Sequence, residues 1–167
     1  MDVWAVLSTL ASIAASLVGF SGLLTAFRAS NTDLTPYDVN NIRSLLIYSV
    51  SALVFALLPL PLAATPMAGS HWSVLTVVLG TNLLFWSWRS PRWMKKKGLR
   101  PRLPKLYFGV LAVQAVVGVA LVAGALWLAD PSALYAFGVL WFLVVALLVF
   151  VVQVFLLLPI DPPRSGE

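Results

Sequence analysis

Charged residues are confined to a few short segments of this chain, and the uncharged segments between them are long enough to cross a membrane. These segments cover residues 3–27, 44–88, 106–129 and 131–160. Crossing about 30 Å of hydrocarbon takes roughly 20 helical residues at 1.5 Å per residue, so the second segment has room for two spans and each of the others for one. The pattern predicts an all-α, polytopic membrane helical bundle with five transmembrane helices, folded as a single integral membrane domain.

Local turn chemistry places the ends of these spans at about residues 3–27, 42–64, 70–88, 106–129 and 131–158. Proline at the first helical position, after a hydroxyl cap, predicts a helix start at Pro36, and Asp130 before proline predicts another. Prolines at 59, 61 and 66 lack a backbone donor, so we expect the second helix to end or kink there and the third to begin near His71. The joint between the last two spans is then very short, and they must be antiparallel neighbours.

The basic residues define an orientation. With five crossings, all eleven Lys and Arg residues fall on the same side of the membrane, eight of them between Arg89 and Lys105. The positive-inside rule makes that side cytoplasmic, so the amino terminus is expected outside and the carboxyl terminus in the cytoplasm. The first span lacks a positive n-region, and we expect it to be retained rather than cleaved as a signal peptide. A bacterial inner (cytoplasmic) membrane is the location that fits this pattern.

Composition excludes several classes of function. Hydrophobic residues make up 60% of the chain and charged residues 10%, and the mean hydropathy of +0.94 is too high for a soluble domain of this size. The pI near 10 comes from the basic loop and does not indicate nucleic-acid binding. No Asp, Glu, Lys, Arg or His lies in the interior of a predicted span, since Arg43 and His71 lie at span ends, and this argues against a proton-coupled pump. Without cysteine, a nucleophile–base pair or a metal-ligand cluster, we expect no enzyme, cofactor or metal site.

The basic loop is the first of three features that could carry function. Its cations are Arg89, Arg92, Lys95, Lys96, Lys97, Arg100, Arg102 and Lys105. A cluster of this density beside a span attracts anionic lipid headgroups by roughly 1 kcal/mol per cation. The alternative is that the charges only set the topology. Since two cations suffice for that, the excess leaves room for contact with anionic lipid at the cytoplasmic face or with an acidic partner.

The second feature is the small-residue surface of the first helix. One row comprises Ser8, Ser12 and Ser16, and the other comprises Ala11, Ala15, Gly19 and Gly22. Small side chains let helices approach closely, which matters because lipid tails are as apolar as leucine and hydrophobicity alone does not drive association. We expect this helix to pack against a neighbour, within the subunit or between subunits. The alternative is that the serine row lines a water-filled path.

The third feature is a polar residue at similar depth in every predicted span, roughly 9 to 12 Å from the cytoplasmic end at 1.5 Å per residue. The five residues are Ser21, Ser49, Asn82, Gln114 and Gln153. An amide facing lipid would lack a hydrogen-bond partner, so we expect these side chains to face inward, with Gln114 and Gln153 able to bond directly. They form either a structural layer that fixes helix register or a cavity open to the cytoplasm.

These features predict a small, non-enzymatic membrane protein that works through helix packing, as a homo-oligomer or as an accessory subunit of a membrane complex. The second interpretation is a passive channel or small-solute carrier that uses the polar layer and the first helix. Helix breaks often flank binding sites in transporters, which favours the second interpretation slightly. The break at Pro59 lies near the membrane edge, where an ordinary helix end is sufficient.

Overall fold

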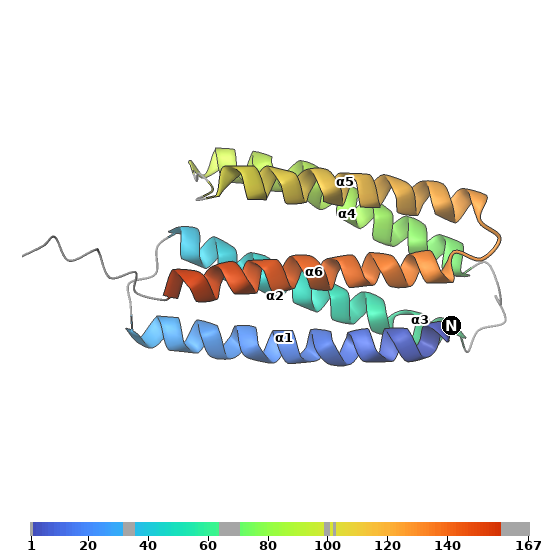
Figure 1. Ribbon diagram of the computed structural model, residues 1–167, viewed down its shortest axis with the longest axis horizontal. Helices are drawn as coiled ribbons and strands as arrows, with labels where there is room; N and C mark the ends of the chain where they lie inside the picture. Colours follow the sequence, from blue (N-terminus) through green and yellow to red (C-terminus); the bar gives the residue numbers. More distant parts are fainter. Residues whose placement is uncertain (1, 32–35, 64–70, 99–100, 102, 158–167) are drawn as a thin grey trace, which may run out of the picture.

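The computed structural model describes residues 2–31, 36–63, 71–98, 101 and 103–157, in which all regular secondary structure is helical. The helices are α1 (Val3–Asn31), α2 (Pro36–Leu57), the short α3 (Pro59–Ala63), α4 (His71–Lys96), α5 (Pro104–Trp127) and α6 (Ser132–Leu157). Each of the five long helices lies along the same axis, and consecutive long helices run in opposite directions (Figure 1). We call the end of the bundle where α2 and α5 begin and α4 ends the basic end.

Four helical segments are long and apolar enough to cross a membrane. They are Val3–Ala26, Val39–Leu62, Pro104–Trp127 and Ser132–Phe155, and between 22% and 39% of each is buried inside the protein. So much exposed apolar surface requires a lipid environment, and the chain is therefore described as a helical membrane protein. Helix α4 is as long as the others but is the least apolar of the five long helices.

Helix starts lie close to where turn chemistry puts them, whereas α4 continues through Pro91 to Lys96 and so extends past the expected span end at residue 88. Helix α2 begins at Pro36, α4 begins at His71, and α2 ends at Leu57 before a single helical turn of proline-containing chain. At the start of α6 the backbone N–H of Ser132 donates to Asp130 Oδ1 at 3.0 Å. That bond, together with one from the Ser132 side chain, holds the pKa of the Asp130 carboxyl below its ordinary value.

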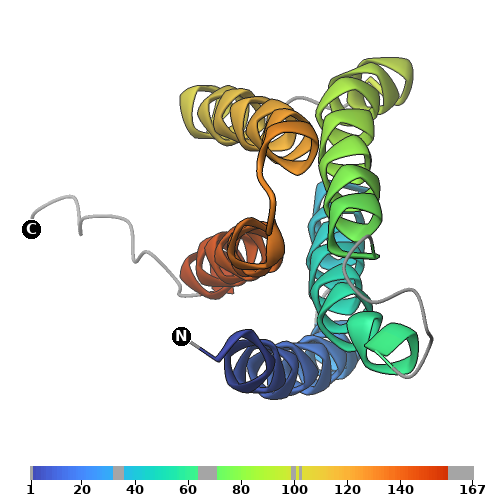
Figure 2. The ribbon, with the colours of Figure 1, turned by 90° about the vertical axis from the view of Figure 1, so that its right-hand side faces the viewer.

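The helices form two groups that meet mainly along α6. Helices α1, α2 and α6 pack together, and α4 and α5 pair closely and lean against them, mainly against α6 (Figure 2). Leu79, Leu83, Leu121 and Phe142 are fully buried between the groups. Their burial gives the bundle a continuous apolar core through its middle.

The backbones of α4 and α5 approach each other closely at a pair of glycines. A Cβ atom placed on Gly80 would lie 2.8 Å from the Gly118 carbonyl oxygen, and one on Gly118 would lie 3.0 Å from the Gly80 carbonyl oxygen. Neither distance leaves room for a methyl group, so only glycine at both positions permits this crossing. The two helices are held together at this point.

Helices α5 and α6 are joined by a tight turn and separate toward the basic end (Figures 1 and 2). At the joined end the bundle is closed by aromatic side chains: the ring of Trp72 lies 5.4 Å from that of Trp4 and 5.6 Å from that of Tyr135. The Tyr135 hydroxyl donates to the carbonyl of Phe55 on α2. The space that opens between α5 and α6 at the other end contains the site described next.

Candidate functional site

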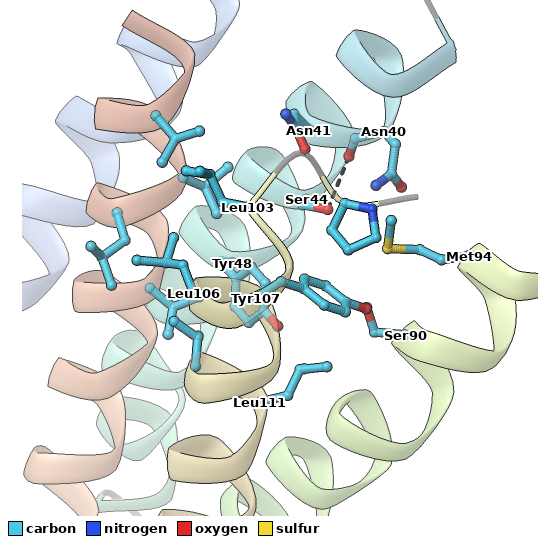
Figure 3. Close-up of a pocket in the computed structure, with 16 residues that line it drawn as sticks. Asn40, Asn41, Ser44, Tyr48, Ser90, Met94, Leu103, Leu106, Tyr107 and Leu111 are labelled. Atoms are coloured by element: carbon cyan, nitrogen blue, oxygen red, sulfur yellow. Dashed lines mark hydrogen bonds between the residues drawn. The ribbon is translucent and has the colours of Figure 1, made fainter. Parts of the chain in front are cut away.

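A cavity of about 120 Å³ opens at the basic end between α2, α4, α5 and α6 (Figure 3). Its polar lining comes mostly from the amino-terminal half of α2 and the last turns of α4, with Tyr107 added from α5: Asn40, Asn41, Ser44, Tyr48, Ser90 and Tyr107. Its apolar lining comes mostly from α5 and α6: Leu103, Leu106, Val110, Leu111, Val145, Leu148, Val149 and Val152. The cavity is therefore amphipathic, with its polar side on α2 and α4 and its apolar side on α5 and α6.

Hydrogen bonds fix much of the polar side. Ser44 Oγ donates to the Asn40 carbonyl at 2.9 Å, and the hydroxyls of Ser90 on α4 and Tyr107 on α5 are 2.8 Å apart. These bonds fix the positions of the hydroxyl groups, which carry no charge. The side-chain amide of Asn40 lines the same wall and offers a ligand both a donor and an acceptor.

The deepest polar contact joins three helices. Tyr48 on α2 donates its hydroxyl proton to Gln114 Oε1 at 3.1 Å, and Gln114 Nε2 donates to the carbonyl of Leu83 on α4 at 3.1 Å. Gln114 is fully buried, so both halves of its amide are paired where water does not reach. This network ties α2, α4 and α5 together below the cavity.

A second pocket of about 80 Å³ lies in the groove between α2 and α4 and shares Asn40, Ser44, Tyr48 and Ser90 with the first. Its remaining lining residues are Arg43, Ile47, Trp86, Arg89 and Trp93. Two arginines from different helices therefore line one small pocket, and none of its described lining residues carries a carboxylate. We call this the arginine pocket.

Aromatic rings position the cations of this end. The guanidinium carbon of Arg43 lies 5.5 Å from the ring centroid of Trp93, that of Arg89 lies 5.6 Å from the ring of Phe85, and that of Arg92 lies 3.7 Å from the ring of Trp88. A ring face attracts a cation by roughly 0.5–1 kcal/mol at an exposed site and leaves the outward N–H groups free to bind an anion. In the part of the chain that the structure describes, no carboxylate pairs with these arginines.

Of the cations predicted to contact anionic lipid, those that the structure describes lie at this end. Arg89, Arg92, Lys95, Lys96, Lys97 and Lys105 are exposed, while Arg100 and Arg102 lie outside the described residues. Among the described residues no group of His, Asp and Glu side chains is arranged to hold a metal ion. The chemistry available here is hydrogen bonding, cation–anion attraction and apolar contact.

The small-residue rows of α1 point mostly away from the bundle. Ala11 is buried, but Ala15, Gly19 and Gly22 are exposed, and a Cβ on either glycine would meet nothing within 4 Å. The serine row is exposed too, and Ser12 and Ser16 donate to the backbone carbonyls four residues earlier. Within the subunit α1 packs through Leu7, Leu10, Ala14 and Leu17 instead. Contact of the small-residue rows with another subunit stays a prediction.

The polar side chains at shared depth are mostly inside the bundle, but they do not form one hydrogen-bonded layer. Ser21, Ser49, Gln114 and Gln153 are buried and Asn82 is half-buried. Ser21 donates to the Val18 carbonyl, while Ser49 Oγ, Asn82 Oδ1 and both amide atoms of Gln153 have no partner among the described residues. Gln114 bonds Tyr48 and Leu83 instead of Gln153. A layer that sets helix register stays a prediction.

Sequence reasoning missed three contributors to this end of the bundle. Asn40 and Tyr48 carry no signal in the sequence beyond belonging to a helix, and Arg43 indicates only topology. Along α2, Arg43 and Ser44 lie three and four residues after Asn40, and Tyr48 lies four residues after Ser44, a spacing that groups them on one helix face. Comparison with family models, with curated proteins and with solved structures gave no match, so function is argued from this geometry.

Proposed function

We propose that this chain is a non-enzymatic, five-span protein of a bacterial cytoplasmic membrane that works by associating with copies of itself or with other membrane subunits through α1. Its basic end lies in the cytoplasm, where the cations contact anionic lipid. The four apolar spans support membrane insertion. Helix α4 lies along the same axis and is paired with α5, which supports counting it as the fifth span.

The observation that carries this proposal is the outward direction of the small residues on α1. Helix α1 lies at the edge of the bundle and contacts only α2 and α6 extensively (Figure 2). Leu7, Leu10 and Leu17 pack inward, while the outward surface carries Gly19 and Gly22 together with the exposed Ile13, Phe20 and Leu23, with open space beyond the two glycines. A glycine facing lipid gains nothing for the monomer, whereas in a helix–helix interface it permits close backbone contact.

Replacing Gly19 by leucine tests this interface. The added side chain meets open space within the subunit, so the fold should be unaffected, while a helix packed against Gly19 should be displaced. We expect the mass of the detergent-solubilised protein to fall to that of a smaller assembly, at an unchanged melting temperature of the monomer. Gly109→Leu on α5 is the matched control, because Gly109 is equally free of neighbours. Equal masses for wild type and Gly19→Leu would place α1 against lipid and end the proposal.

The cavity at the basic end favours a second candidate, a small-solute carrier or passive channel. Its polar side could orient a neutral polar molecule that enters from the cytoplasm. Fully buried Leu79, Leu83 and Phe142 fill the bundle beyond it, which supports a binding pocket over a continuous pore. In proteoliposomes, Ser44→Trp should abolish solute flux by filling the cavity, and Gly109→Leu should not. Absence of flux of glycerol and similar neutral solutes through the wild type would reject this candidate.

A further inference from the structure

We propose that the arginine pocket and the neighbouring amphipathic cavity together form one binding site for an anionic phospholipid, whose phosphate lies between Arg43 and Arg89 and whose acyl chain enters toward α5 and α6. The inference rests on the proposed contact between the basic end and anionic lipid, and it names the residues and the ligand class of that contact. It does not depend on association through α1.

The arginine pocket has the groups that a phosphate needs. Arg43 from α2 and Arg89 from α4 line the same pocket of about 80 Å³, with the Asn40 amide beside them. A guanidinium donates two parallel N–H bonds to phosphate oxygens and keeps its charge at any physiological pH. The indole groups of Trp86 and Trp93 complete the lining, and tryptophan is the residue enriched at the headgroup level of a membrane. No carboxylate among the described residues lines the pocket to compete with the anion.

The adjoining cavity has the surface that an acyl chain needs. Val110 on α5 and Val145, Val149 and Val152 on α6 belong to its apolar wall. A cavity of about 120 Å³ is close to the roughly 150 Å³ that accommodates a benzene molecule, so it holds a segment of one chain while the remainder lies in the bilayer. The polar and apolar walls thus follow the order of a lipid, from phosphate to hydrocarbon.

The two pockets together favour a lipid over a soluble anion. Both are lined by Asn40, Ser44, Tyr48 and Ser90, so a molecule in one lies against the other. A soluble phosphate would use the arginines and leave the apolar cavity unfilled, whereas a phospholipid uses both. The same end of the bundle also carries the other described cations, which raise the local concentration of anionic headgroups.

The test is a titration of the purified protein with phosphatidylglycerol in a neutral detergent, with bound lipid counted by native mass spectrometry. A cation beside an anionic headgroup contributes about fivefold in affinity, so Arg43→Gln with Arg89→Gln should weaken binding about 25-fold. The matched control is Lys95→Gln with Lys96→Gln, which removes the same charge from exposed residues that line neither pocket. We expect less than about a threefold change there, because salt screens charges that do not touch the ligand.

A second pair of measurements separates the chain from the headgroup. Val152→Trp fills the apolar wall, and each methylene that it excludes should cost about fourfold in affinity for phosphatidylglycerol, without changing the binding of inorganic phosphate. If the double glutamine variant shows a lowered melting temperature, Arg43→Lys with Arg89→Lys is read instead. It retains the charge but loses the bidentate geometry, so it should still bind more weakly than wild type.

Each result decides between the site and the broader lipid contact. Equal weakening by the arginine pair and the lysine pair would overturn the site and leave diffuse attraction of anionic lipid in place. No weakening by either pair would reject both proposals. Binding of inorganic phosphate as tight as that of phosphatidylglycerol, or an unchanged lipid affinity in Val152→Trp, would refute the lipid as occupant and leave a soluble-anion pocket.

Discussion

The crossing of Gly80 and Gly118 gives the sharpest test of how this bundle is held together. A methyl group on Gly80 would lie 2.8 Å from the Gly118 carbonyl oxygen, 0.6 Å short of the 3.4 Å at which ordinary van der Waals contact begins. The same Cβ would lie 2.9 Å from Val122 Cγ2 and 3.0 Å from Leu121 Cβ. A backbone oxygen has no rotamer to change, so Gly80→Ala must push α4 and α5 apart.

Two opposing effects set the size of the change in the free energy of unfolding of Gly80→Ala. Overpacking a filled interior costs typically 1–3 kcal/mol, whereas alanine in place of glycine favours a helix by about 1 kcal/mol. We therefore expect the free energy of unfolding of Gly80→Ala to fall by about 0–2 kcal/mol. Gly109→Ala on α5 meets nothing within 4 Å and should be neutral or more stable by up to about 1 kcal/mol. The difference between the two variants, about 1–3 kcal/mol, is the quantity that decides.

The measurement is reversible unfolding in mixed micelles of a mild detergent and dodecyl sulfate, with helix content followed by circular dichroism. Separation of α4 from α5 also lengthens the hydrogen bond from Gln114 Nε2 to the Leu83 carbonyl, which is 3.1 Å in the wild type. Protection of the Gln114 side-chain amide from hydrogen exchange should therefore fall together with the free energy of unfolding. If Gly80→Ala proves as stable as Gly109→Ala, the two helices do not meet at the glycines, and close backbone approach is not what pairs them.

Two further predictions concern the polar network and the orientation. A double-mutant cycle of Gln114→Leu and Tyr48→Phe in the unfolding assay should give a coupling free energy of about 0.6 kcal/mol, and at most about 1.7 kcal/mol. The reason is that the 3.1 Å hydrogen bond between the two side chains joins two helices. Additive effects of the two substitutions would mean that the bond contributes nothing. The chain has no cysteine, so single cysteines report topology cleanly. Gly98→Cys should be shielded from a membrane-impermeant thiol reagent in intact cells and Ala129→Cys labelled, and the reverse pattern would invert the orientation.

The positions where helices begin were predictable from the sequence because the chemistry of a helix start is local. Pro36, His71 and the turn at Asp130 are read from the residue itself and its immediate neighbours, and the structure has helices beginning at Pro36, His71 and Ser132. A missing backbone donor or a capping carboxylate acts in the same way whatever the helix packs against. The all-helical character and the apolar spans follow from the same short-range information.

Which small residues pack within the subunit was not predictable in this way. The repeats on α1 drew attention to Gly19 and Gly22, yet the glycines that meet each other's backbone within the subunit are Gly80 and Gly118, which lie on different helices. A row of small residues says that one helix face can be approached, but the rotation of the helix depends on all its side chains. On α1, Leu7, Leu10 and Leu17 take the inward face.

The partner of Gln114 shows the same dependence on tertiary geometry. A buried amide must find a partner, which made its inward direction predictable, but adjacency of the last two helices suggested Gln153. The tight turn at Asp130 brings α5 and α6 together only at the joined end, where the aromatic rings of Trp4, Trp72 and Tyr135 close the bundle. Toward the basic end the two helices separate, so Gln114 bonds α2 and α4, and the space left beside it is the amphipathic cavity. The proposed lipid site therefore lies at the basic end, where the described cations that would recognise an anionic headgroup also lie.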